Sequence, residues 1–276
     1  MKYLVMSLLI AGSLFSAEIK PDKIMVYKHT EQTDLTMHIF NPEEHKSGDK
    51  TPCILFFFGG GWVSGSPSHF YPQAEYLSSR GMTAMCADYR TKNKYETSPK
   101  ECVRDGKSAI RWVRANADAL GVDPNMIAAG GGSAGGHVAS ATAALDGFNE
   151  KTDNLEVSCR PNALVLFNPV FDNGPNGYGY ERVKDYWRGF SPLHNIHKDM
   201  PQATVFLGTK DDLIPVSTAE TFKTKMNKLG NRCDLHTYKG CEHGFFNKKK
   251  FYETLLEADK FLTSLGYLEG KPTLKK

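Results

Sequence analysis

The segment Gly131 to Gly135, GGSAG, holds the residues of this sequence that are best suited to chemistry. It follows an apolar run that predicts a strand, Met126 to Ala129, and precedes small residues that predict a helix, His137 to Leu145, with a turn over 130–136 between them. A Gly-x-Ser-x-Gly between a strand and a helix is typical of the nucleophile elbow, whose tight turn strains the serine backbone and exposes its Oγ. The pattern therefore predicts Ser133 as a nucleophile, against the simpler reading of a glycine-rich turn.

A serine hydroxyl is a weak nucleophile unless a base accepts its proton. His243 is the candidate base, because it lies in a loop, 240–245, that follows the last predicted strand. It also comes after the serine in the chain, as the base does in enzymes with a nucleophile elbow. His137 adjoins the elbow, but it begins a predicted helix, so we expect it to serve packing or capping.

The base must in turn be oriented by a carboxylate. The loop Gly208 to Pro215 follows a predicted strand and lies between serine and histidine in the chain. It offers Asp211 and Asp212, of which we favour Asp211. Asp172, after the preceding predicted strand, is the alternative acid.

A second glycine cluster, Phe58 to Trp62 (FGGGW), follows the apolar run that ends at Phe58. Glycines at the end of a strand let backbone N–H groups turn toward a developing anion. The amides of Gly60, Gly61 and Ala134, the residue after the serine, are therefore candidates for an oxyanion hole. A flexible loop without chemistry is the competing interpretation.

Strand and helix patterns alternate along the chain, which predicts an α/β fold with a mostly parallel central sheet flanked by helices. The predicted strands are a leading hairpin, Lys23 to Tyr27 and Leu35 to Phe40, then Cys53 to Phe58, Met82 to Tyr89, Met126 to Ala129, Ala163 to Phe167, Thr204 to Leu207 and Asp234 to Tyr238. The predicted helices are Gln73 to Arg80, Pro99 to Leu120, His137 to Leu145, Thr218 to Leu229 and Phe251 to Leu265.

Composition limits the range of functions. The chain has 276 residues and a formal net charge of +3, without a basic stripe, so we expect neither nucleic acid nor an anionic membrane surface as a partner. Its six cysteines form no Cys-x-x-Cys pair, which favours buried thiols over a disulfide framework, although one bridge stays open.

The N-terminus has the pattern of a signal peptide. Lys2 precedes the apolar stretch Tyr3 to Phe15, which is too short to span a bilayer and is followed by the small residues Ser16 and Ala17. We therefore expect residues 1–17 to direct a secreted or periplasmic location and residues 18–276 to form one domain. A buried first element is the alternative.

With these motifs in this order, the chain resembles the α/β-hydrolase superfamily, and within it the hormone-sensitive-lipase-like esterases and bacterial carbohydrate acetylesterases. The resemblance covers nearly all of residues 18–276 and rests on motifs in the family's order: FGGGW, Asp88-Tyr89-Arg90, Asp123-Pro124, the elbow, 208–215 and His243-Gly244-Phe245. It implies a Ser133, Asp211, His243 triad, acyl transfer to water, and no metal or other cofactor.

Two positions depart from the family's pattern. Phe58 stands where a histidine usually begins the glycine cluster, and Gly132 stands where an aspartate often precedes the serine. The hole's donors are backbone amides, so we expect packing of Phe58 and Trp62 to hold the loop in place of a polar contact. The segment before the cluster is also too short for the family's helical cap.

A lid must then come from elsewhere, and the insert from Phe171 to Met200 is rich in aromatic residues. The candidate substrate-binding residues are Tyr178 and Trp187 in this insert and Trp62 beside the glycine cluster. The insert's aromatic rings could stack on sugars, or they could form a small core of their own under the loop.

These features predict a secreted serine carboxylesterase that hydrolyses short-chain acyl esters, with acetyl groups on carbohydrates as a candidate substrate. Its partner would be a small-molecule or oligosaccharide ester, without stable membrane insertion. Two alternatives stay open: a serine peptidase of the prolyl-oligopeptidase type, and a non-catalytic binding protein with the same fold.

Overall fold

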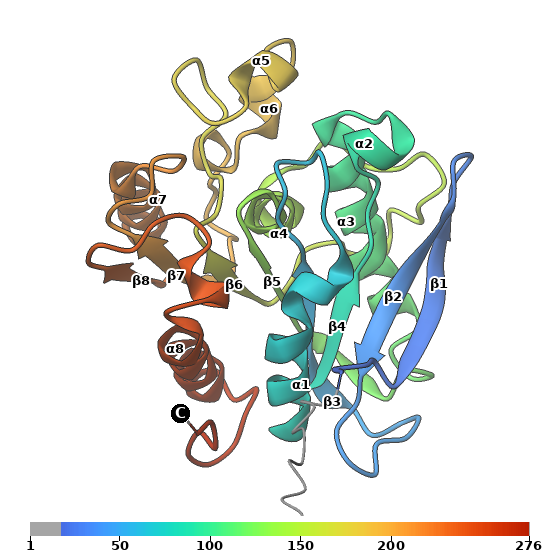
Figure 1. The fold of residues 1–276 in the computed structure, drawn as a ribbon. Coiled ribbons are helices and arrows are strands. Elements are labelled where there is room, and N and C mark those ends of the chain that lie inside the picture. Colours follow the sequence, from blue (N-terminus) through green and yellow to red (C-terminus); the bar gives the residue numbers. More distant parts are fainter. Residues whose placement is uncertain (1–17, 276) are drawn as a thin grey trace, which may run out of the picture.

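The computed structural model describes residues 18–275, which are built around an eight-stranded sheet (Figure 1). The predicted signal peptide, 1–17, lies outside the described residues. The strands are β1 (Lys23–His29), β2 (Asp34–Phe40), β3 (Thr51–Phe57), β4 (Thr83–Ala87), β5 (Val122–Gly132), β6 (Ala163–Phe167), β7 (Gln202–Gly208) and β8 (Cys233–Tyr238). Their order in the sheet is β1-β2-β4-β3-β5-β6-β7-β8.

The sheet is mostly parallel, as the sequence predicts. β2 pairs antiparallel with both β1 and β4, so the predicted leading hairpin forms one edge of the sheet. Every other neighbouring pair, from β4–β3 through to β7–β8, is parallel. The carboxyl ends of these parallel strands therefore meet along one edge, where ligands bind in open α/β sheets.

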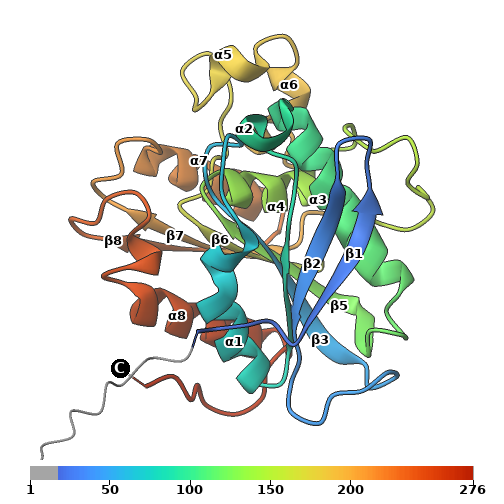
Figure 2. The same cartoon turned by 45° about the vertical axis from the view of Figure 1, so that its right-hand side comes forward.

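Helices cover both faces of the sheet (Figures 1 and 2). The longer ones are α1 (Tyr71–Ser79), α3 (Pro99–Ala115), α4 (Ala134–Ala144), α7 (Val216–Lys228) and α8 (Phe251–Ser264). Buried residues of α3, α4 and α7 belong to one apolar core, and those of α1 and α8 belong to the other.

The strand β3 shows why its sequence is continuously apolar. Cys53, Leu55 and Phe57 belong to the core on the α4 side, whereas Ile54 and Phe56 belong to the core on the α1 side. Successive side chains of a strand point to opposite faces, so a strand covered on both faces has no polar alternation.

Most predicted elements differ from the observed ones by a few residues at their ends, and two of these differences change the description of the chain. No separate turn spans 130–136, because β5 continues to Gly132 and α4 begins at Ala134, so the turn is Ser133 alone. The helix predicted to reach Leu120 ends at Ala115, since the Asn116 amide side chain donates to Trp112 O and the chain turns toward β5.

The six cysteines are buried free thiols, in agreement with the prediction. Burial raises the pKa of Cys53 and of Cys86 well above the ordinary thiol value. These thiols are therefore protonated and packed as small apolar groups.

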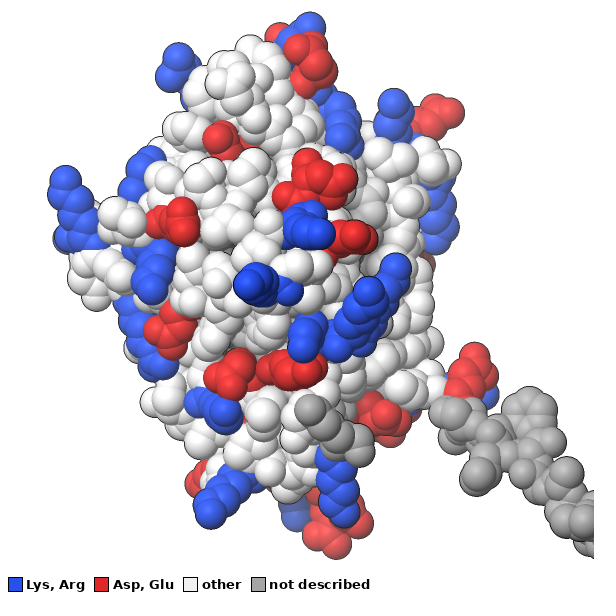
Figure 3. Space-filling view, turned by 60° about the vertical axis from the view of Figure 1, so that its left-hand side comes forward, with Lys and Arg blue, Asp and Glu red and all other residues white. Residues whose placement is uncertain are grey.

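The insert after β6 stands above the carboxyl edge of the sheet, at the top of Figures 1 and 2. It contains the single-turn helices α5 (Tyr180–Val183) and α6 (Trp187–Phe190); a third short helix, α2 (Lys92–Tyr95), lies below it (Figure 1). No helix within residues 18–275 is long and apolar enough to span a bilayer. On the face shown in Figure 3, basic and acidic side chains are interspersed without a continuous area of one sign.

Candidate active site

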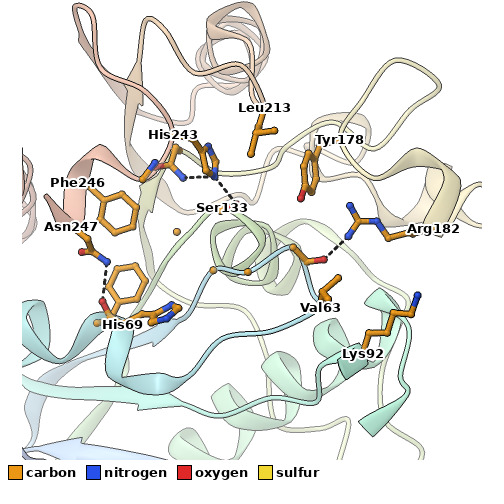
Figure 4. A pocket seen from close by; sticks show the side chains of 17 residues that line it. Val63, His69, Lys92, Ser133, Tyr178, Arg182, Leu213, His243, Phe246 and Asn247 are labelled. Carbon is orange, nitrogen blue, oxygen red and sulfur yellow. Dashed lines mark hydrogen bonds between the residues drawn. The ribbon is translucent and has the colours of Figure 1, made fainter. Parts of the chain in front are cut away.

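Loops from four parallel strands converge at the carboxyl edge of the sheet. Ser133 directly follows β5, Asp211 follows β7, His243 follows β8, and the glycine cluster follows β3. Residues separated by more than a hundred positions therefore lie around one cavity (Figure 4).

The backbone of Ser133 is strained, with φ 54° and ψ −120°. Its N–H donates to Phe167 O at 2.9 Å, and its carbonyl accepts from Val170 N at 3.2 Å, so the end of β6 and the residues directly after it hold the turn. A Cβ at Gly135 would lie 2.0 Å from Phe57 O, and one at Gly131 would lie 2.5 Å from Gly135 C. Glycine is therefore required on both sides of the serine, as the sequence pattern predicts.

His243 bridges the serine and one aspartate. Its Nε2 lies 2.9 Å from Ser133 Oγ, and its Nδ1 lies 2.7 Å from Asp211 Oδ2. The Asp211 side chain is fully buried, and its other oxygen accepts from the amides of Leu213 at 3.0 Å and Ile214 at 2.9 Å. These bonds fix the carboxylate, which in turn selects the imidazole tautomer with its proton on Nδ1.

The two other candidate acids lie elsewhere. Asp212 is exposed to solvent. Asp172 Oδ1 accepts from Gly174 N at 2.7 Å and lies 3.8 Å from His194 Nδ1, so it stabilises the start of the insert. Neither carboxylate has a hydrogen bond with His243 among the described residues.

Asn168 also contacts the histidine, and sequence reasoning missed it. Its Nδ2 lies 3.3 Å from His243 Nε2, and its Oδ1 accepts from Gly244 N at 3.2 Å. The residue is fully buried after β6 with φ 34°, an unusual value for a non-glycine residue. Its place after a parallel strand, like that of Asp211, is the sequence signal that could have identified it.

The glycine cluster adopts conformations that favour glycine. Gly60 has φ 128° and Gly61 has φ 64°, and a Cβ at Gly60 would lie 2.0 Å from Ser64 O. Neither of these two amides has a hydrogen-bond acceptor among the described residues. Ala134 begins α4, so its N–H belongs to the first turn, which has no intrahelical acceptor. These three N–H groups are thus free for a ligand oxygen.

Phe58 holds the base of this loop by packing. Its ring is 1% exposed and stacks on Tyr89, with centroids 4.0 Å apart. Tyr89 Oη donates to the Phe58 carbonyl at 2.6 Å, and a Cβ at Gly65 would lie 2.3 Å from Phe58 Cδ2. An aromatic contact therefore occupies the position for which the resemblance suggests a histidine.

A polar contact holds the far end of the same loop. Arg182 of α5 donates from Nη1 to Gly61 O at 2.6 Å. Its guanidinium also lies over the rings of Trp62, at 5.5 Å, and Tyr178, at 5.2 Å. The insert is therefore tied to the glycine cluster, which no local sequence pattern indicated.

The cavity at Ser133 has a volume of about 660 Å³. Phe70, Phe246, Tyr178 and Leu213 contribute ring and aliphatic surface to its wall. A Cβ at Gly132 would lie 2.6 Å from Phe246 Cζ. This contact explains why the residue before the serine is glycine here: a larger side chain would displace the Phe246 ring.

Of the three predicted substrate-binding residues, only Tyr178 lines this cavity. Trp62 is 1% exposed and packs edge-on against His137, with centroids 5.1 Å apart, so it belongs to the core beneath the loop. Trp187 packs against the His194 ring, at 5.1 Å, away from Ser133. The positions of Trp62 and Trp187 correct the prediction for these two.

The remaining insert aromatics mostly form a small core. Tyr186 and Phe148 both pack against Phe190, at 5.4 Å, and Phe190 is fully buried. His137 completes this packing, 4.4 Å from Phe190, and burial lowers the pKa of His137 to about 3. Its role in packing matches the prediction, and the imidazole is neutral.

The described residues contain no cluster of three or more His, Cys, Asp or Glu that could hold a metal ion. The site offers a strained serine, a partly exposed imidazole paired with a buried carboxylate, and free backbone amides. This combination can add a hydroxyl to a carbonyl carbon and hold the resulting oxyanion.

Two family models match the chain. The BD-FAE model matches residues 37–171, and the dienelactone hydrolase family model matches residues 183–266. Together they cover the elements that carry Ser133, Asp211 and His243.

Solved structures and curated relatives are similar to the chain. The propionate-bound esterase of Thermogutta terrifontis is 41% identical, with a TM-score of 0.86 over 90% of this chain and 96% of that one. An AB hydrolase superfamily protein of Schizosaccharomyces pombe is 28% identical over 84% of this chain and 74% of its own length. An acetylxylan esterase of Xylanibacter ruminicola is 28% identical over 79% of this chain, which spans 45% of that relative.

Proposed function

Since the chain belongs to the esterases of the α/β-hydrolase superfamily and is a carboxylic ester hydrolase, we propose that it cleaves short-chain acyl esters through a covalent intermediate on Ser133. The observation that carries this proposal is the position of His243, which contacts Ser133 Oγ with one ring nitrogen and Asp211 with the other. A nucleophile, a base and an orienting acid are the groups that acyl transfer through serine requires.

The geometry gives each residue a role in the proposed reaction. Ser133 Oγ attacks the ester carbonyl while His243 Nε2 takes its proton, and Asp211 stabilises the imidazolium that forms. The amides of Gly60, Gly61 and Ala134 donate to the oxyanion. His243 then gives the proton to the alcohol oxygen, and the alcohol leaves.

The second half of the reaction repeats these roles with water. His243 takes a proton from the water molecule that attacks the acyl-enzyme, and the same amides hold the second oxyanion. Return of the proton to Ser133 Oγ releases the carboxylic acid. No step requires a metal or an organic cofactor.

The proposal of short acyl groups is supported by the ligands bound to one relative and by the substrate class of another. Structures of the Thermogutta terrifontis esterase have been solved with bound propionate and with bound butyrate. The acetylxylan esterase among the relatives supports acetyl groups on a carbohydrate as the substrate class. Tyr178 in the cavity wall is the aromatic ring that would contact a sugar.

We also propose that the protein is exported. The proposal rests on Lys2, the apolar stretch Tyr3 to Phe15 and the small residues after it. Expression of the full chain in a bacterium, followed by fractionation and mass measurement of the purified product, tests it. Export predicts a periplasmic or secreted product that lacks the N-terminal segment; a full-length cytoplasmic product contradicts it.

A substrate panel tests the proposed chemistry. Purified protein is assayed on aryl esters from acetyl to decanoyl, on acetylated xylo-oligosaccharides and on peptide amides. The proposal predicts highest kcat/KM for short acyl chains and measurable deacetylation of the sugar. Preference for peptide amides would instead indicate a peptidase, and preference for long chains would contradict the short-acyl assignment.

A further inference from the structure

The wall of the catalytic cavity carries positive charge on one side. Lys92 and Arg182 both line the cavity, and no Asp or Glu is among the described residues that do so. In Figure 4 the two cations lie on the same side of Ser133, opposite Phe246 and Asn247. A neutral ester needs no such charge, so the presence of two cations in the wall of the catalytic cavity calls for a functional explanation.

Arg182 is anchored and yet retains unused donors. One N–H, on Nη1, binds Gly61 O, and the rings of Trp62 and Tyr178 hold the guanidinium plane. The other N–H groups of the guanidinium have no hydrogen-bond acceptor within residues 18–275. A planar guanidinium that is held in place by its surroundings is well suited to bind a carboxylate, because little side-chain freedom is lost on binding.

Lys92 provides the second charge. It begins α2, and its backbone N–H donates to Trp62 O at 3.1 Å, so its position is fixed relative to the glycine cluster. Its side chain is exposed and forms no ion pair with a described residue. Its ammonium group is therefore available to a ligand.

Both cations line the same cavity as Ser133, and Arg182 is linked to the serine through the glycine cluster. A Cβ at Gly59 would lie 3.4 Å from Ser133 Cβ, and one at Gly61 would lie 3.5 Å from Arg182 Nη1. The backbone from Gly59 to Gly61 spans at most about 7 Å. The guanidinium and the nucleophile are thus connected through three residues of the glycine cluster, and both line the same cavity.

A smaller cavity of about 310 Å³ adjoins the first and shares Gly61, Val63, Lys92 and Arg182 with it. Glu96 lines this second cavity, is exposed, and forms no ion pair with either cation among the described residues. The pair Lys92 and Arg182 therefore stands between the two spaces, with one unpaired acid on the side away from Ser133.

We propose that Lys92 and Arg182 form an anion subsite, so that the preferred substrates are short esters that carry a carboxylate on their acyl or alcohol part. This inference rests on the proposed esterase function. The subsite is partly open to solvent, so each charge–carboxylate contact contributes modestly and is weakened by salt. The main effect of the subsite is therefore on the kcat/KM of anionic esters relative to that of neutral esters.

The test compares matched anionic and neutral esters at pH 7.5 and low ionic strength. For the alcohol part, para-acetoxybenzoate is compared with para-acetoxybenzamide; for the acyl part, para-nitrophenyl hydrogen succinate is compared with para-nitrophenyl butyrate. The measured quantity is the ratio of kcat/KM for the anionic ester to that for its neutral partner. Intrinsic reactivity cancels when this ratio is compared between variants.

Lys92→Gln should lower this ratio by about threefold to tenfold for one of the two ester pairs, the one whose carboxylate binds at the subsite. Arg182→Gln should lower the same ratio, in addition to its effect on the loop. Lys94→Gln is the matched control: it removes the same charge from the same short helix, two residues along, outside the cavity lining. This control should leave both ratios unchanged, and added salt should reduce the wild-type ratio.

The outcomes distinguish failure of the anion subsite from failure of the proposed esterase function. Hydrolysis of the neutral esters with ratios that Lys92→Gln does not change would overturn the anion subsite and leave the esterase function intact. An equal fall in Lys94→Gln would also overturn it, because the effect would then be one of general surface charge. Absence of hydrolysis of all four esters would instead reject the proposed function, and the subsite with it.

Discussion

Arg182, on a single-turn helix of the insert, donates a 2.6 Å hydrogen bond to the carbonyl of Gly61, a residue 121 positions earlier in the chain. The bond fixes the carbonyl of Gly61, whose own amide has no acceptor among the described residues and is a candidate oxyanion donor. If these amides bind the oxyanion as proposed, the insert affects catalysis through their orientation.

Replacement of Arg182 should lower kcat on a neutral short ester. Arg182→Ala removes the bond to Gly61 O, so we expect kcat to fall by about tenfold to a hundredfold, less than the full loss of an oxyanion donor. KM for the neutral ester should change little. Millimolar guanidinium should restore part of the lost kcat; failure to restore any, together with a rise in KM alone, would contradict the positioning role.

The choice between the acids is tested by three amide substitutions. Asp211→Asn should lower kcat by about 10⁴, because an amide cannot hold the imidazole in the required tautomer. Asp212→Asn and Asp172→Asn should each cost far less, since neither side chain contacts His243. A loss of about 10⁴ in kcat for Asp172→Asn instead would show that the orienting acid is Asp172, which follows β6.

Phe58 should act through packing. Phe58→Ala removes the ring that stacks on Tyr89 and should destabilise the fold by about 3–5 kcal/mol. It should also lower kcat, with about 10² to 10³ as the upper limit. Phe58→Leu should keep most activity; a Leu variant that folds, by circular dichroism, but is as inactive as the Ala variant would show that the ring itself is required.

Chain order and local motifs predict much of this site. Ser133 and His243 lie where the elbow pattern and the loop after the last strand predict them, and Asp211 is the acid that the structure brings to the imidazole. Parallel strands place their carboxyl ends together, so loops after strands converge whatever their sequence separation. The same rule explains why Asn168, which directly follows β6, lies beside His243.

Other features depend on tertiary packing that sequence patterns do not encode. Trp62 beside a glycine loop could face the cavity or the core, and only the positions of His137 and Phe190 decide that it faces the core. Arg182 lies in an irregular insert without periodicity, so its contact with Gly61 has no local signal.

Burial of His137 makes stability depend on pH. Its pKa in the folded state is about 3, below the unfolded value of about 6.5. Below pH 6.5 the unfolded chain therefore binds a proton that the folded chain does not, so stability falls as pH decreases from about 6.5 toward 3, by up to about 1.4 kcal/mol per pH unit.

The variant His137→Gln cannot bind that proton. Its free energy of unfolding, measured by urea titration between pH 7 and pH 4.5, should fall less steeply than that of the wild type, even if it is lower at pH 7. Parallel curves for the two proteins would show that protonation of His137 does not contribute.

Formation of an acyl-enzyme on Ser133 is tested most directly by covalent labelling together with turnover. A structure of the Thermogutta terrifontis relative has been solved with the enzyme phosphorylated by paraoxon. Paraoxon should inactivate the present protein stoichiometrically, with the diethylphosphoryl group on the peptide that contains Ser133 by mass spectrometry. Ser133→Ala should remain folded, take up no label and lose about 10⁴ to 10⁶ in kcat on a short aryl ester. A folded Ser133→Ala variant that still turns over the ester, or a label on another residue with full inactivation, would contradict the assignment.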